Sequence, residues 1–187
     1  MYEVELKVRA DHDDVRERLE ALDAKELGGV AQADTYYDAP HRDFAETDEA
    51  LRIRRERRTD AVVDEDAAET AKVTYKGPLV ERESKTREEF ETGVDDGETM
   101  AGVLGGLGFE PAAVVEKERE YFRVDEYTVV LDDVAGLGEF VEVEREAEES
   151  ELETVREGAA AVLRQLGLDP DEQIRTSYLG LLLAKRE

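Results

Sequence analysis

The stretch Met1-Tyr2-Glu3-Val4-Glu5-Leu6-Lys7-Val8-Arg9 decides the fold that we expect for this chain. Apolar and charged residues alternate strictly along it, which is typical of a strand with one face in a core. Because successive strand side chains point to opposite faces, Glu3, Glu5 and Lys7 must stand in a row on the other face. A strand face exposed to solvent has a similar pattern. The charges on the later strands are therefore needed to decide whether this face is ordinary surface or a functional site.

The rest of the sequence predicts further strands and helices. In residues 50–57, Arg52 and Arg54 alternate with apolar side chains, so a second polar face is basic. Periodicity and capping residues predict strands at 1–9, 30–38, 50–57, 71–76, 85–91, 114–124, 127–133 and 139–144, and helices at 11–28, 98–107, 150–166 and 171–184. The order predicts an α+β fold with a large antiparallel sheet, in one domain over residues 1–187.

Three local features are also expected from residue type. Gly77-Pro78 should turn the chain after its strand, and Ser150 with Glu153 should form a capping box. The acidic run 59–69 lacks periodicity and should be a loop.

The composition limits the possible partners and surroundings. The chain has 50 Asp plus Glu against 25 Lys plus Arg, a net charge of -25, and no Cys. Such a surface argues against nucleic acid and anionic membranes, since both need a basic footprint. The abundance of carboxylates and the scarcity of lysine predict a cytoplasmic protein of a halophile. No apolar run approaches the ~20 residues of a membrane span, and thiolate sites are excluded.

The polar strand faces collect a coherent set of charges. Its members are Lys7, Arg52, Arg54, Lys76, Arg87, Lys117 and Arg119 together with Glu3, Glu5, Glu89, Glu142 and Glu144. If the sheet closes on itself, the cations can bind phosphoryl oxygens while the carboxylates hold a divalent metal. The alternative is solvated charge on an acidic protein, but Lys7, Lys76 and Lys117 all fall on these faces of a lysine-poor chain. Carboxylate ligands without Cys or clustered His favour Mg²⁺ or Mn²⁺ over Zn²⁺.

An ordered set of motifs then resembles a known family. Glu3-Val4-Glu5-Leu6-Lys7 matches an ExExK signature, and it is followed by Asp34-Thr35-Tyr36-Tyr37-Asp38, Ala50-Leu51-Arg52-Ile53-Arg54, Tyr75-Lys76-Gly77-Pro78, Lys85-Thr86-Arg87-Glu88-Glu89, Lys117-Glu118-Arg119, Leu131-Asp132-Asp133-Val134 and Gly136-Leu137-Gly138-Glu139-Phe140-Val141-Glu142-Val143-Glu144. The set resembles the CYTH, or triphosphate tunnel metalloenzyme, superfamily. Within that superfamily, the residues of these motifs are most similar to those of the class IV adenylate cyclase branch. The resemblance implies an eight-stranded antiparallel closed β-tunnel with surrounding helices, often as a homodimer.

The resemblance also implies roles for single residues. Mg²⁺ or Mn²⁺ would be bound by Glu3, Glu5, Glu142 and Glu144, and a triphosphate by Lys7, Arg52, Arg54, Lys76, Arg87, Lys117 and Arg119. The residues implied as catalytic are Glu3, Glu5, Lys7 and Arg119.

The implied reaction converts ATP to cyclic AMP and pyrophosphate. Hydrolysis of inorganic tripolyphosphate, thiamine triphosphate or another organic triphosphate is an alternative, and a non-catalytic polyphosphate- or nucleotide-binding module is another. Some bacterial cyclases of this class carry a His-Phe pair before ExExK, whereas here Met1-Tyr2 precede it, so the reaction stays open between these alternatives.

Overall fold

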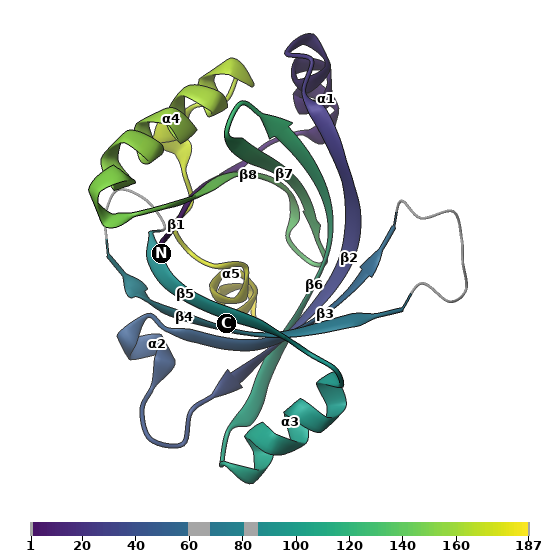
Figure 1. The fold of residues 1–187 in the computed structure, drawn as a ribbon, viewed down its shortest axis with the longest axis vertical. Helices are drawn as coiled ribbons and strands as arrows, with labels where there is room; N and C mark the ends of the chain where they lie inside the picture. The colour runs from purple at the N-terminus through teal and green to yellow at the C-terminus, as the bar shows by residue number, and fades with distance from the viewer. Residues whose placement is uncertain (1, 60–67, 81–85, 187) are drawn as a thin grey trace.

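Eight antiparallel strands close into a barrel in the computed structural model, which describes residues 2–59, 68–80 and 86–186 (Figure 1). The strands are β1 (Tyr2–Arg9), β2 (Lys25–Asp38), β3 (Ala50–Arg58), β4 (Thr70–Leu79), β5 (Arg87–Val94), β6 (Glu110–Val124), β7 (Tyr127–Val134) and β8 (Gly138–Ala147). The helices are α1 (His12–Ala21), α2 (Phe44–Thr47), α3 (Gly97–Gly106), α4 (Leu152–Gln165) and α5 (Tyr178–Lys185), with short 3-10 turns at Glu149–Glu151 and Pro170–Glu172. The predicted closed antiparallel tunnel is therefore confirmed.

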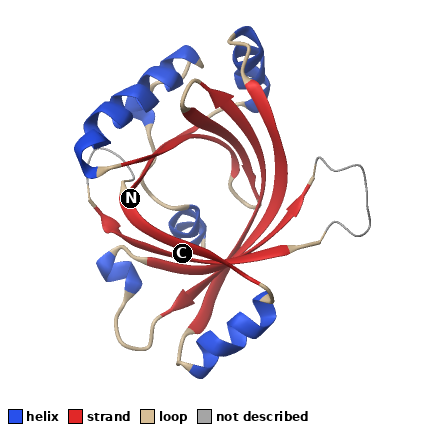
Figure 2. Ribbon diagram, viewed as in Figure 1, coloured by secondary structure: helices blue, strands red, loops and turns tan. Residues whose placement is uncertain are grey.

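Closure of the barrel depends on the first strand. The order around the ring is β1-β5-β4-β3-β2-β6-β7-β8, so β1 pairs on one side with β5 and on the other with β8. The pairing with β8 runs from Tyr2, opposite Ala147, to Arg9, opposite Phe140. Helices α1 and α4 lie outside the ring on one side, and α2 and α3 lie outside it on the opposite side (Figure 2).

The main apolar core lies outside the barrel rather than within it. The apolar face of β1, with Val4, Leu6 and Val8, packs with residues of α1 and α4 such as Leu19 and Leu163. Because side chains alternate across a strand, this packing turns the charged face of β1 toward the lumen.

A smaller apolar cluster closes one end of the lumen. Tyr36, Val115, Val134 and Phe140 share strand faces with the buried charged residues, and Tyr178 from α5 packs against them. In Figure 1, α5 accordingly lies within the outline of the ring of strands. The C-terminal helix thus forms part of the lumen wall at this end.

Two predicted elements end differently because of local backbone geometry. Helix α1 stops at Ala21, not near Gly28, because Asp23 adopts a left-handed conformation (φ 56°) and the Ala24 N–H donates to the Leu19 carbonyl. Strand β4 does not turn at Gly77-Pro78 but continues to Leu79 with a shift of register opposite β5. A bulge admits proline because an irregular position needs no ladder donor.

The C-terminal helices also begin at other residues than predicted. The capping box that precedes α4 joins Glu148 and Glu151 instead of Ser150 and Glu153. The sequence predicts a single helix over 171–184, but the structure has a 3-10 turn followed by α5. Ser177 Oγ accepts the Gly180 N–H and so caps the start of α5. Most of the expected acidic loop, residues 60–67, and the expected start of a strand at Lys85 lie outside the described residues.

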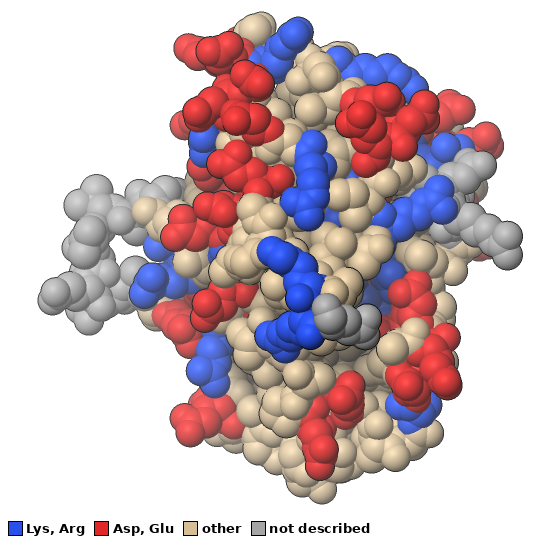
Figure 3. Space-filling view, turned by 180° about the vertical axis from the view of Figure 1, so that it is seen from behind, with Lys and Arg blue, Asp and Glu red and all other residues tan. Residues whose placement is uncertain are grey.

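Carboxylates are spread over the outer surface, with basic side chains between them (Figure 3). The strong acidity of the chain is therefore not confined to one patch on the face shown. Among the helices in the described part of the chain, none has the length and apolar character to cross a membrane.

Candidate functional site

A buried aspartate, Asp34 of β2, gathers three cations in the lumen. Arg54 lies opposite it on β3 and donates two hydrogen bonds, from Nε at 2.7 Å and from Nη2 at 2.8 Å. Lys117 Nζ on β6 lies 3.0 Å from Oδ2, and Arg52 Nη1 lies 3.5 Å from the same oxygen. Burial alone would raise the pKa of Asp34, but the charges of Arg52 and Lys117 and the bonds from Arg54 hold it well below its usual range.

The lysine of this group has a lowered pKa. Burial lowers the pKa of Lys117 to about 7, Asp34 opposes that shift, and the charges of Arg54, Arg119 and Arg52 add to it. An additional anion beside the ammonium group would reverse this balance by favouring the charged form.

A second buried aspartate, Asp132 of β7, holds the guanidinium of Arg119. The Arg119 Nε and Nη2 donate to its two oxygens at 2.5 and 2.8 Å, and Tyr178 Oη donates to Oδ2 at 2.7 Å. Arg119 Nη2 also donates to Glu142 on β8. Because each donor is directed by a fixed carboxylate, the guanidinium has little rotational freedom.

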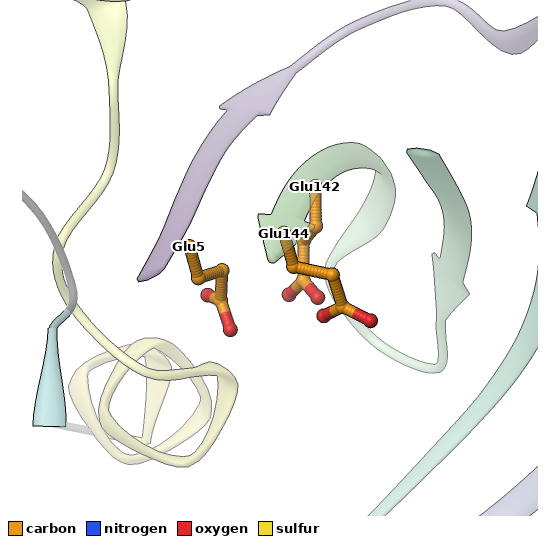
Figure 4. A group of neighbouring side chains, drawn as sticks. All are labelled: Glu5, Glu142 and Glu144. Carbon is orange, nitrogen blue, oxygen red and sulfur yellow. The ribbon is translucent and has the colours of Figure 1, made fainter. Parts of the chain in front are cut away.

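Three carboxylates converge from β1 and β8. Oxygen atoms of Glu5, Glu142 and Glu144 lie within 4.8 Å of one another, and Figure 4 shows the three side chains directed into the same space. The register of the two strands explains this, since Glu5 lies directly opposite Glu144 and Glu142 follows two residues away on the same face. We call these residues the carboxylate triad.

The negative charges of the carboxylate triad lie close together, and this affects the pKa of Glu144. Burial raises the pKa of Glu144 well above its usual range, and the charges of Glu3, Glu142 and Glu5 add to this shift while Arg119 opposes it. Like charges at this spacing are costly unless a proton or a cation compensates them.

Glu3 lies outside this triad, beside Lys76. Lys76 Nζ lies 2.8 Å from Glu3 and 3.1 Å from Glu89. Burial tends to raise the pKa of Glu3, but Lys76 and a hydrogen bond with Glu89 hold it below its usual range. Burial raises the pKa of Glu89 to about 7, with Lys76 opposing and Glu3 adding to the shift.

The two remaining predicted cations have separate surroundings. Lys7 is buried, its Nζ donates to the Thr176 carbonyl at 2.8 Å, and it lies 4.1 Å from the centre of the Tyr178 ring. Arg87 donates to the carbonyls of Asp48 and Gly77 at 2.6 and 2.9 Å, so it contacts the segment before β3.

The profile of the CYTH domain matches residues 1–178 of this sequence. The chain belongs to the CYTH family. A Methanocaldococcus jannaschii protein named "putative adenylate cyclase" is 40% identical to it over 183 residues, which cover 97% of this chain and 98% of that protein.

Solved structures share this CYTH fold. A protein of Pyrococcus horikoshii is 38% identical, with a TM-score of 0.88 over 98% of this chain and 99% of that one. A Hippeastrum "putative adenylyl cyclase", described as having a dominant triphosphatase activity, is 20% identical, with a TM-score of 0.68 over 98% of this chain and 95% of that one. At that identity the Hippeastrum structure shows the fold alone.

The CYTH, or triphosphate tunnel metalloenzyme, family implies a divalent metal, and the carboxylate triad fits one. All of its donor atoms are carboxylate oxygens, which hard divalent cations prefer. Glu5 and Glu142 are buried and Glu144 is half-buried, so their mutual repulsion is poorly screened by water.

Three residues of this CYTH lumen were not assigned a role from sequence. Asp34 and Asp132 are part of the motifs quoted above. Their positions on the charged strand faces could have indicated that they lie in the lumen. Tyr178 had no such signal, because it begins a leucine-rich helix that reads as ordinary packing.

Proposed function

We propose that this protein is a divalent-metal-dependent enzyme that acts on a triphosphate held in the lumen, and that it converts ATP to cyclic AMP and pyrophosphate. The observation that carries the proposal is the carboxylate triad lying in the same lumen as buried cations, with Arg119 joining the two through its bond to Glu142. A metal-bound triphosphate needs both groups side by side.

The cations supply the phosphate site. We assign binding of the phosphoryl oxygens to Lys7, Arg52, Arg54, Lys76, Arg87, Lys117 and Arg119, of which Lys7, Arg52, Arg54, Lys117 and Arg119 are buried. In a buried site these charges act in a low effective dielectric, so they neutralise phosphate more strongly than surface groups do. Aspartates 34 and 132 hold three arginines and a lysine in place before substrate arrives, which limits reorganisation during the reaction.

The metal site is assigned to Glu5, Glu142 and Glu144, with Glu3 as a neighbour that acts on them through its charge. We propose Mg²⁺ or Mn²⁺ as the ion, because the donors are all carboxylates. When bound, such an ion supplies charge stabilisation at the phosphoryl oxygens and lowers the pKa of an attacking hydroxyl.

In the cyclase reaction the ribose 3′-hydroxyl loses its proton to solvent, its oxygen attacks the α-phosphorus, and the bond to pyrophosphate breaks. Arg119 and Lys117 then neutralise charge that grows on the leaving group. The M. jannaschii relative, with 40% identity over nearly the whole chain, supports this reaction through its name.

Triphosphate hydrolysis is the second candidate, with water attacking the phosphate chain in place of the ribose hydroxyl. The water attacks the terminal phosphorus, the bond to the remaining diphosphate breaks, and orthophosphate is released. The same residues serve this reaction, and the Hippeastrum protein is described as having a dominant triphosphatase activity. A binding module without turnover is disfavoured, because the carboxylate triad would repel phosphate in the absence of a metal.

The test is to incubate the purified protein at high salt with Mg²⁺ or Mn²⁺ and with ATP, thiamine triphosphate or tripolyphosphate, and to separate the products. Cyclic AMP with pyrophosphate supports the cyclase, while orthophosphate without cyclic nucleotide shows a hydrolase instead. Triphosphate binding without any product would leave a binding module. Glu142→Gln should abolish turnover, and Glu118→Gln, on the exposed face of β6, is the matched control.

A further inference from the structure

The segment before α5 contacts the first strand at its lysine. The Ile174 N–H donates to the Lys7 carbonyl at 2.7 Å, and Lys7 Nζ donates to the Thr176 carbonyl at 2.8 Å. Both the backbone and the ammonium group of Lys7 are therefore held by one segment, in which Thr176 is 169 residues from Lys7 in sequence.

The ring of Tyr178, at the start of α5, faces two cations of the lumen. Its centre lies 4.1 Å from Lys7 Nζ and 5.3 Å from Lys117 Nζ. Both distances are within the ~6 Å over which an ammonium is attracted to an aromatic face. Because Tyr178 and both lysines are buried, this attraction is little weakened by water.

The hydroxyl of Tyr178 begins a hydrogen-bond chain toward the carboxylate triad. It donates to Asp132 at 2.7 Å, Asp132 accepts from Arg119, and Arg119 donates to Glu142. One side chain of the C-terminal helix thus contacts two cations directly and reaches a third through Asp132.

We propose that Tyr178 is a positioning residue of the triphosphate site, whose ring orients the ammonium groups of Lys7 and Lys117 and whose hydroxyl orients Arg119 through Asp132. This inference rests on the proposed function, since it takes these cations as triphosphate ligands. Packing alone explains the contact of the ring with Phe140. Packing against Phe140 does not require a hydroxyl on the ring. Nor does packing explain why the Tyr178 hydroxyl donates to Asp132, the carboxylate that holds Arg119.

The ring and the hydroxyl can be tested separately. Tyr178→Phe keeps the ring and removes the donor to Asp132, whereas Tyr178→Leu removes both. Tyr127 offers matched controls, because it is also buried and its hydroxyl donates to the Val155 carbonyl at 3.0 Å in the outer core, away from the lumen. Tyr127→Phe and Tyr127→Leu therefore report the effect of the same chemical changes on stability alone.

The measurements are tripolyphosphate binding to the full-length protein by calorimetry with Mg²⁺ present, and kcat and KM for the substrate that the wild type turns over. We expect Tyr178→Leu to weaken tripolyphosphate binding by about five- to thirtyfold. For Tyr178→Phe we expect kcat to fall by about tenfold, with binding changed by less than about threefold. Arg119 keeps its bonds to Asp132 and Glu142, so it still binds phosphate, but it loses part of the orientation that it needs as charge grows on the leaving group.

Two results would overturn the inference. If both Tyr178 variants keep wild-type binding and kcat and lose only stability, as the Tyr127 variants should, Tyr178 is a packing residue. If the wild type binds no tripolyphosphate, the proposed function fails before any variant is compared, and the role of Tyr178 fails with it. Should Tyr178→Leu not fold, Tyr178→Phe decides the matter, because it preserves the ring volume.

Discussion

The ammonium of Lys117 lies 3.0 Å from the carboxylate of Asp34, and both side chains are buried in the lumen of the barrel. The same carboxylate accepts two hydrogen bonds from Arg54, so one aspartate compensates several cations. This arrangement lets a protein with a net charge of -25 keep a concentrated cationic site.

Removing the charge of Asp34 should destabilise the fold. Asp34→Asn leaves buried Arg52, Arg54 and Lys117 without their shared counter-charge, so we expect the free energy of unfolding to fall by about 3–5 kcal/mol. Denaturant unfolding at high salt measures this. Asp133→Asn, at an exposed position of β7, should change it by no more than about 0.5 kcal/mol. Equal stability of the two variants would show that Asp34 is not the required counter-charge.

Triphosphate binding should take up a proton at alkaline pH. The pKa of Lys117 is lowered to about 7 in the free protein, and a bound polyanion favours its charged form. Above this pKa, Lys117 is neutral before binding and charged after it, so uptake should approach one proton at about pH 8.5. Calorimetry of tripolyphosphate binding to the Mg²⁺-saturated protein, in buffers of different ionisation enthalpy, measures the uptake. Lys117→Met should lose it, and an unchanged value in that variant would assign the proton to another group.

Metal affinity should rise with pH. Burial and the charges of Glu3, Glu142 and Glu5 raise the pKa of Glu144, and a metal requires the carboxylate form, so a proton must leave on binding. Below this raised pKa, Mn²⁺ affinity should increase by about tenfold per pH unit, and it should level off above it. Titration of free Mn²⁺ by electron paramagnetic resonance gives the affinity. Glu144→Gln should flatten the dependence; a slope that persists in this variant would exclude Glu144 as its source.

Glu89 should make the fold less stable as pH rises through a defined window. The pKa of Glu89 is raised from 4.5 to about 7, so between these values the native state holds a proton that the unfolded chain has released. The free energy of unfolding therefore falls across this window, by at most about 3 kcal/mol from this group.

Glu89→Gln cannot ionise and should be more stable than the wild type at pH 8, with no such difference at pH 4.5. Denaturant unfolding at both pH values compares the two proteins. Glu88→Gln, at the exposed neighbouring position, should show no pH-dependent gain. A gain of equal size at both pH values would mean that the effect is not the ionisation of Glu89.

Salt should stabilise the protein. Carboxylates are distributed over its surface and the net charge is -25, so mutual repulsion opposes the compact state. Raising KCl from about 0.1 M to about 1 M shortens the Debye length from about 10 Å to about 3 Å, which weakens this repulsion. We expect Tm to rise over this range in thermal unfolding followed by circular dichroism. A Tm that is constant or falls would contradict the prediction that the chain is adapted to concentrated salt.

Much of the barrel could be predicted because its signal is local. Alternation in residues such as Val4, Glu5 and Leu6 assigns faces within one strand, whatever that strand pairs with. Element ends were less predictable. The end of α1 depends on a left-handed Asp23, a conformation that residue type does not fix, and β4 accommodates Gly77-Pro78 as a bulge only because β5 pairs on both sides of it.

The sequence by itself determined the α+β class, the charged strand faces and the family to which the chain belongs. Only the tertiary structure decided which charges meet: Glu3 contacts Lys76 while Glu5 joins Glu142 and Glu144, although both glutamates stand on one strand face. The physical reason is that a strand face is set by neighbours along the chain, whereas a contact across the lumen is set by register and barrel closure. Tyr178 illustrates this, since its position beside Lys7 depends on the path of the whole chain between them.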